Sequence, residues 1–166
     1  QELVGTFFNS GSAYVFKLRN GRWVLDQRLI ADDTTANPFF GESVAVSGST
    51  IVVGAERNRT DSAGNNLLTN AGAAYVYEYV AGQWQYQEKL SASVRTSSFF
   101  GRAVDISGNR IAVSAPEEWV QNGVPLGYYG AVYIFDKDAQ GNWNESIHIA
   151  DSSFRGGAKF IALEDS

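Results

Sequence analysis

One passage recurs almost three times along this chain of 166 residues. Residues 39–55 read FFGESVAVSGSTIVVGA, and residues 99–116 read FFGRAVDISGNRIAVSAP. A chain that repeats itself at a fixed period is typical of one supersecondary unit stacked on its own copies, because a single unit cannot bury its apolar face alone. Landmark residues follow the same interval of about 60 residues: Tyr14, Tyr75 and Tyr133; Trp23, Trp84 and Trp143; Leu29, Leu90 and Ile149.

Within each unit the apolar residues alternate with a period of two, which predicts β-strands rather than helices. Residues 43–46 lead through Ser47-Gly48 into residues 50–53, and residues 74–77 lead through Ala81-Gly82 into residues 84–87. β-Branched and aromatic runs joined by short Gly-containing turns are typical of hairpins. We therefore expect four antiparallel strands in each unit.

The connections between these strands differ in length. Those between first and second strands, and between third and fourth strands, are tight. The connections at residues 31–39, 56–71, 92–99 and 117–129 are long. In an up-and-down sheet both long classes emerge on one face, and long loops on a rigid scaffold tend to carry function. We expect that face to be the binding face.

The bulk composition excludes several classes of function. A net charge of −5, with 13 scattered Lys and Arg residues, disfavours a nucleic-acid partner. No apolar run reaches the roughly 18 residues of a membrane-spanning helix, so no membrane insertion is expected. The chain begins with Gln1 and contains no methionine, which indicates a processed chain or a part of a longer one. Without cysteine, disulfides and thiolate chemistry are excluded.

Two stretches of the chain resemble FG-GAP repeats. They begin with Phe40-Gly41 and Phe100-Gly101, and they end with Gly54-Ala55-Glu56 and Ser114-Ala115-Pro116. A degenerate third opening stands at residues 154–157. The family includes the integrin α-subunit propeller, some fungal lectins and many secreted bacterial proteins. The resemblance implies an all-β propeller of four-stranded antiparallel blades, in an extracellular, secreted or cell-surface protein that is not an enzyme.

The resemblance also bears on metal binding. Integrin propellers hold calcium in carboxylate-rich loops between first and second strands. In this chain those hairpins are Ser-Gly turns, too short to wrap a cation that needs six to eight oxygens. Residues 136–141 (DKDAQG) look like a calcium loop, but they align with turns that hold no metal ligands. We expect no metal and no cofactor.

The ends of the chain align with two different strands of one unit. Residues 2–6 align with second strands, and residues 158–163 align with first strands. The single domain 1–166 is therefore three units permuted by one strand: residues 39–98, residues 99–156, and a split blade of 1–38 with 157–166. Three blades cannot close a ring of the usual 4–8 blades. Either further chain completes the propeller to about six blades, or a second copy does so. We favour a homodimer, with assembly residues Glu2, Leu3, Val4, Phe160, Ile161 and Leu163.

The residues available for catalysis are few. The one histidine, His148, falls on an outer strand that we expect to lie far from the long loops. The pair Asp32-Asp33 could be half of a glycosidase site, but adjacent acids on a polar loop are usually solvated. No nucleophile elbow or phosphate-binding loop occurs. We therefore expect no catalytic residues.

The residues available for binding are richer. Trp119, Tyr128 and Tyr129 are long-loop aromatic residues without counterparts in the other units, and a flat apolar platform beside polar groups suits a sugar ring or a partner side chain. Folding of Trp119 over its own loop is the alternative interpretation. The full set of candidate ligand-binding residues is Trp119, Tyr128, Tyr129, Phe39, Phe99, Arg95 and Asp32.

The sequence thus predicts an extracellular recognition or adhesion module that binds a glycan or a protein. The alternative is a structural protein that assembles into a ring or filament by strand exchange. Two sequons, at Asn58 and Asn144, would matter only in a eukaryotic secretory route.

Overall fold

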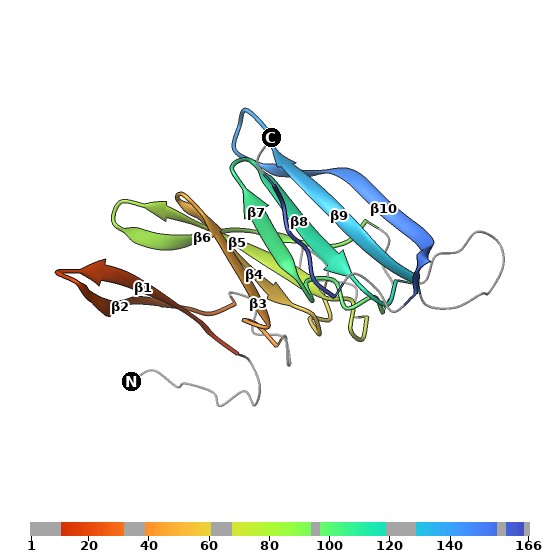
Figure 1. Ribbon diagram of the computed structural model, residues 1–166, viewed down its shortest axis with the longest axis horizontal. Coiled ribbons are helices and arrows are strands. Elements are labelled where there is room, and N and C mark those ends of the chain that lie inside the picture. Colours follow the sequence, from red (N-terminus) through yellow and green to blue (C-terminus); the bar gives the residue numbers. More distant parts are fainter. Residues whose placement is uncertain are drawn as a thin grey trace.

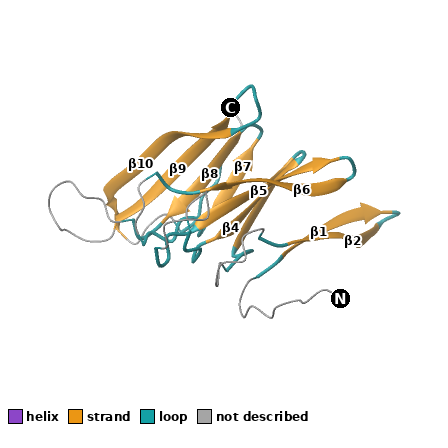
Figure 2. Cartoon of the chain, turned by 180° about the vertical axis from the view of Figure 1, so that it is seen from behind, coloured by secondary structure: helices purple, strands orange, loops and turns teal. Residues whose placement is uncertain are grey.

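The computed structural model describes residues 11–31, 39–60, 68–93, 97–118, 129–155 and 159–164, with the backbone alone for residue 129 and residues 151–155. Ten strands and no helix occur in these ranges (Figures 1 and 2). In the same ranges there is accordingly no helix of the length and apolarity needed to cross a membrane. The strands are β1 (Ala13–Arg19), β2 (Arg22–Leu29), β3 (Ser43–Ser47), β4 (Thr50–Ala55), β5 (Ala73–Val80), β6 (Gln83–Leu90), β7 (Val104–Ser107), β8 (Arg110–Ala115), β9 (Tyr129–Lys137) and β10 (Trp143–Arg155).

The strands form three antiparallel up-and-down sheets. The first sheet pairs β1 with β2, the second runs β3-β4-β5-β6, and the third runs β7-β8-β9-β10. The three sheets follow one another side by side as successive propeller blades (Figure 1). The predicted all-β fold class, with four-stranded antiparallel blades, is confirmed.

The repeat extends to irregular details of the backbone. A register shift interrupts the pairing of third and fourth strands between Val15 and Phe16, and again between Val76 and Tyr77. Gly21 and Gly82 have positive φ in the tight turns that follow. Such turns match the right-handed twist of the flanking strands, which is why glycine occurs there. The two hairpins predicted from the sequence are confirmed.

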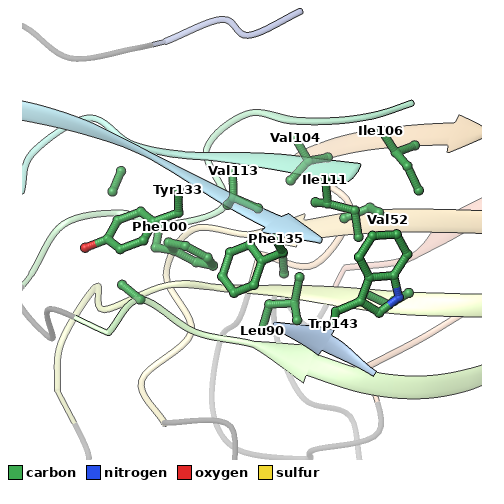
Figure 3. Close-up of a cluster of buried hydrophobic side chains, with 14 of the residues drawn as sticks. Val52, Leu90, Phe100, Val104, Ile106, Ile111, Val113, Tyr133, Phe135 and Trp143 are labelled. Atoms are coloured by element: carbon green, nitrogen blue, oxygen red, sulfur yellow. The ribbon is translucent and has the colours of Figure 1, made fainter. Parts of the chain in front are cut away.

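The core lies between neighbouring sheets. Figure 3 shows the cluster between the second and third sheets, where Val52 and Leu90 of the second sheet meet Tyr133 and Phe135 of the third sheet and Phe100, which precedes β7. An equivalent cluster joins the first and second sheets, with Leu29 against Phe40, Tyr75 and Trp84. Full burial of one such side chain contributes about 1.5–3 kcal/mol, so the stacking of sheets is the main stabilising interaction of the fold.

Each Phe-Gly opening joins one sheet to the previous one. Phe40 forms an isolated bridge with Gly11, and Phe100 forms the same bridge with Gly72. A Cβ atom on Gly72 would lie 1.9 Å from the Phe100 carbonyl oxygen, so only glycine permits this approach. The Phe100 ring then packs edge-on to Tyr133, with 5.3 Å between ring centroids.

The C-terminal part departs from the repeat in two ways. The degenerate opening at residues 154–157 differs from the other two openings, because β10 continues to Arg155, which pairs with Tyr129 beyond a register shift. Residues 159–164 form no strand in the single chain. They run beside β7, where the Leu163 amide donates to Asp105 Oδ2 over 2.6 Å (Figure 1). The proposed pairing of this segment with residues 2–4 stays a prediction, because residues 1–10 lie outside the described ranges.

Candidate ligand-binding site

A cavity of about 480 Å³ opens where the long connections of the second and third sheets meet. It receives residues from the β4–β5, β6–β7 and β8–β9 connections and from the segment after β10. The prediction that both classes of long loop emerge on one face is therefore confirmed. The lining residues are Glu56, Arg57, Phe99, Arg102, Pro116, Glu117 and Lys159.

Phe99 provides the aromatic surface of the cavity. Its backbone has φ 55°, a left-handed conformation that is costly for a residue with a Cβ atom. Its amide donates to the Asn70 carbonyl over 2.9 Å, and its carbonyl accepts from the Arg102 amide over 3.1 Å. The buried Phe100 ring anchors the next position. These contacts fix Phe99 at the surface rather than in the core.

A buried carboxylate organises the charges of the cavity. Glu56 is buried and accepts a hydrogen bond from Arg102 Nη1 over 2.6 Å, while Arg57 Nε lies 3.5 Å from the other carboxylate oxygen. The hydrogen bond from Arg102 to Glu56 raises the pKa of the guanidinium further above its usual range. Because this charge-assisted pair fixes Arg102, its remaining N–H donors stay available in a defined orientation.

The lining residues combine one aromatic ring with two guanidinium groups, one ammonium group and two carboxylates. Glu56 is already paired, so the groups that remain exposed, Arg57, Lys159 and Glu117, offer both donors and an acceptor. The volume of the cavity lies in the range of small-ligand sites, but five of its seven lining side chains are charged, so it suits a polar ligand rather than an apolar one.

The structure describes only some of the predicted site residues. Phe99 lines the cavity. Phe39 has the equivalent left-handed backbone (φ 46°), and the Arg57 guanidinium carbon lies 4.5 Å from its ring centroid, but Phe39 does not line the cavity. The backbone of Tyr129 begins β9, and its side chain is not described. The candidates that lie outside the described residues are Trp119, Tyr128, Arg95 and Asp32.

The charged residues of the cavity were not predicted, although the amino-acid sequence contains a signal for them. Two charged residues differ in sign from their counterparts in the preceding unit. Arg102 stands where that unit has Glu42, and Glu117 stands where it has Arg57. These reversals of charge between equivalent positions lie in the cavity and beside it.

His148 was expected to lie far from the long loops, and this expectation was wrong. Its Nε2 lies 2.8 Å from Oε1 of Glu118, a buried residue of the β8–β9 connection. The other oxygen of Glu118 accepts from the Tyr133 hydroxyl, whose ring stacks on His148 with 4.4 Å between centroids. His148 therefore holds the base of this connection. The pair is absent from the lining of the cavity.

The calcium-like turn at residues 136–141 is organised by its own hydrogen bonds. Asp138 Oδ1 accepts from the amides of Gln140 and Asn142, each over 2.9 Å, and Oδ2 accepts from Asn144 Nδ2. These bonds, with that from the Asn142 amide foremost, lower the pKa of Asp138. Among the described residues no group of three or more metal-ligating side chains comes together. The oxygens of Asp138 already have donors, which is the arrangement of a polar turn.

Comparison with known proteins agrees with this geometry. The family model described as FG-GAP repeat matches residues 23–77 and 84–135. No match to a curated protein was found.

Proposed function

This chain belongs to the FG-GAP repeat family, and on that premise we propose that it is a non-enzymatic recognition module. FG-GAP repeats occur in adhesion and recognition propellers, are typical of extracellular or cell-surface proteins, and are generally not enzymes. The fold alone does not determine a ligand, because one fold carries many sites. The ligand must therefore be argued from the site.

The observation that carries the proposal is the cavity on the long-loop face. Phe99 offers a flat apolar surface, and Arg57, Arg102 and Lys159 offer hydrogen-bond donors around it. A sugar ring presents an apolar face and a rim of hydroxyl groups, so these two features suit a glycan. The lining holds three cationic side chains against two carboxylates, and the Glu56 carboxylate is buried in its pair with Arg102, so the exposed charge favours a glycan that carries carboxylate or sulfate groups. An extracellular protein with an acidic loop is the other ligand class.

The test is a glycan array probed with the purified chain, followed by calorimetric titration of the best ligand. We expect acidic glycans to bind, and Phe99→Ala and Arg57→Ala each to weaken binding at least tenfold. The control is Phe16→Ala, which removes an exposed ring of β1 that does not line the cavity. Equal weakening by Phe16→Ala, or binding that Phe99→Ala leaves unchanged, would place the site elsewhere.

Trp119 extends the same test to the long loop. The proposal includes Trp119, Tyr128 and Tyr129 as ligand contacts, because they are long-loop aromatic residues without counterparts in the other units. Trp119→Ala should weaken binding while changing stability by less than about 1 kcal/mol, as is usual away from a core. A large loss of stability would show instead that Trp119 packs within the fold.

Self-assembly is a second candidate function. One specific observation favours it: the large apolar side chains of Phe16 and Trp23 in the first sheet, and of Phe160 in the segment after β10, are exposed. An exposed apolar surface of this kind marks an interaction site or an aggregation hazard.

A further inference from the structure

Each of the three sheets places a side chain that can carry a positive charge opposite the tyrosine of its third strand. These pairs are Tyr14 with Arg28, Tyr75 with Lys89, and Tyr133 with His148. Arginine and lysine keep their charge throughout the physiological pH range, whereas histidine is the side chain that changes its charge there. The third sheet therefore has a titratable group at the position where the first two sheets have a permanent cation.

The residue that starts the long connection beside this position also differs between the sheets. Asn58 begins the β4–β5 connection and Glu118 begins the β8–β9 connection, and both are buried. The backbone turn is the same in both, because the Asn58 amide donates to the Ala55 carbonyl over 3.0 Å and the Glu118 amide donates to the Ala115 carbonyl over 3.3 Å. One turn thus carries a neutral side chain and the other carries a carboxyl group.

Glu118 depends on His148 for compensation of its charge. The side chain of Glu118 is 1% exposed, and within the described part of the chain His148 is the one cationic group paired with it, at 2.8 Å. The remaining carboxylate oxygen accepts from the Tyr133 hydroxyl. Whichever member of the pair holds the proton, its loss leaves a net negative charge on a buried carboxylate, which is costly.

The groups that face His148 come from two elements. Among the described strands β10 pairs with β9 alone, and the titratable side chain of β9 opposite His148 is Tyr133. The β8–β9 connection supplies Glu118 and, next to it, Glu117. On β10 itself, Glu145 accepts from the hydroxyl of a serine that follows β6. The charge of the imidazole therefore acts first on Glu118.

The residues before Glu118 connect this pair to the cavity on the long-loop face. Pro116 and Glu117 line the cavity, and we call these two residues the cavity wall. The Glu117 amide donates to the Ser98 carbonyl over 3.1 Å, and Ser98 directly precedes the aromatic Phe99. The hydrogen bonds of the Glu118 side chain consequently fix the cavity wall at its distance from the Phe99 ring.

We propose that Glu118 and His148 are positioning residues that hold the cavity wall more firmly at low pH than at high pH. At low pH the pair keeps its proton and the buried carboxyl group is compensated. As the pH rises through the range in which histidine loses its charge, the compensation is lost and the wall loosens. Tighter binding of an acidic glycan at low pH is the consequence, and this part rests on the proposed function. The β4–β5 side of the cavity is unaffected, because its pair is Asn58 and Lys89.

Amide hydrogen exchange of the full chain, followed by NMR, tests the positioning without any ligand. The Glu117 and Glu118 amides report on the wall, and the Asn58 amide of the equivalent turn is the internal reference. After correction for intrinsic exchange rates, we expect the protection of the Glu117 and Glu118 amides to fall about tenfold between pH 5.5 and pH 8. The protection of the Asn58 amide should not change. A wild-type wall with the same protection at both pH values would overturn the proposal.

Three substitutions separate the charge of the pair from its packing. His148→Lys introduces the permanent cation of the second sheet and should keep the protection of the wall high at both pH values. Glu118→Gln removes the buried charge and should make the protection independent of pH. His148→Gln keeps a hydrogen-bond donor without a charge and should give low protection at both. Circular dichroism verifies that each variant is folded. A pH dependence that survives in His148→Lys or in Glu118→Gln would contradict the proposal.

Calorimetric titration with a sulfated tetrasaccharide from heparin, whose charge is the same at pH 5.5 and pH 8, tests the consequence for binding. We expect wild-type affinity to be about fivefold lower at pH 8, and the affinity of His148→Lys to be equal at both. A tetrasaccharide that binds at neither pH would contradict the proposed function, while hydrogen exchange still decides the positioning. Equal wild-type affinity at the two pH values, with a wall that loosens, would show that the wall does not control the ligand.

Discussion

Asn58 Nδ2 donates a hydrogen bond to the hydroxyl of Tyr75 over 2.8 Å, and both side chains are almost fully buried. Asn58 Oδ1 accepts from the Thr60 amide, and the Thr60 hydroxyl accepts from Lys89 Nζ over 2.6 Å. The hydrogen bonds of this polar cluster hold the start of the β4–β5 connection against the second sheet. The third sheet has a cluster of other residues at the same place, formed by Glu118, Tyr133 and His148. The amide of the first sequon is thus inside the fold, and a folded chain does not present it for glycosylation.

Replacing Asn58 should destabilise the fold. Asn58→Ala removes the donor to Tyr75 and the acceptor for Thr60, and buried groups left without partners cost about 1–3 kcal/mol. Urea denaturation should show a loss of this size. The control is Asn144→Ala in the second, exposed sequon, which should change stability by less than about 0.5 kcal/mol. Equal effects of the two changes would contradict the importance of the buried cluster.

Substitutions of Phe99 and Phe100, which are adjacent in one opening, should affect binding and stability respectively. Phe100→Ala empties a fully buried site against Tyr133 and should cost about 3–5 kcal/mol. Phe99→Ala removes an aromatic ring from the cavity and should leave stability nearly unchanged, because the strained backbone and its hydrogen bonds remain. Thermal denaturation and glycan binding, measured on both variants, check this. A stability loss from Phe99→Ala as large as that from Phe100→Ala would show that Phe99 belongs to the core.

Removal of the negative charge of Glu88 should increase the stability of the chain. Its partial burial raises the pKa of the carboxyl, although the hydrogen bond from the Trp143 amide opposes this. A folded-state pKa above the unfolded value means that the contribution to stability is complete below the unfolded pKa and is lost as pH rises through the folded pKa. Glu88→Gln should therefore stabilise the chain at pH 7.5 and have little effect at pH 4.

The first sheet supplies the matched control for this change. Gln27 stands at the equivalent position and bonds both the amide and the carbonyl of Trp84. Gln27→Glu should lower stability at pH 7.5 where Glu88→Gln raises it. Urea midpoints of both variants at the two pH values measure the effect. A loss of stability from Glu88→Gln at pH 7.5 would show that the carboxylate is the better acceptor there.

Calcium should be unnecessary for the folded state. The carboxylate of Asp138 accepts hydrogen bonds from its own turn, and Asp136 accepts from Arg110 Nε over 2.7 Å. A bound ion would stabilise the chain by mass action and its removal would lower the melting temperature. We expect a chelator to leave the melting temperature unchanged within about 1 °C. A larger drop that added calcium reverses would show that these residues bind the ion.

The architecture was predictable from the sequence because the repeat, the period-two alternation and the Gly-containing turns all indicate the same strands. The positions of Phe40 and Phe100 followed from the family pattern, and both are buried as the openings of successive blades. The meeting of the long loops on one face followed from the up-and-down order of the strands. These features depend on neighbours in sequence or on exact repetition.

The charged part of the candidate site depends on contacts between units and was not predicted. Arg102 meets Glu56, 46 residues away, because the second and third sheets stack, and the repeat alone does not show which loop residues of two units meet. His148 was misplaced for the same reason, since its partner Glu118 precedes it by 30 residues. Trp23 is exposed, whereas Trp84 and Trp143 at the equivalent positions of the other units are buried. It differs because none of the described strands packs over this face of the first sheet.

Removal of residues 158–166 tests the self-assembly candidate. Residues 158–163 align with the first strands of the other units, and the described part of this segment forms no strand in the single chain, where the Leu163 amide donates to Asp105. If copies exchange this segment, sedimentation velocity should show that the shortened chain no longer assembles. A labelled peptide of residues 157–166 should bind the shortened chain, and a scrambled peptide of the same composition should not. A shortened chain that assembles like the full chain, or a peptide that binds no better than its scrambled control, would contradict strand exchange.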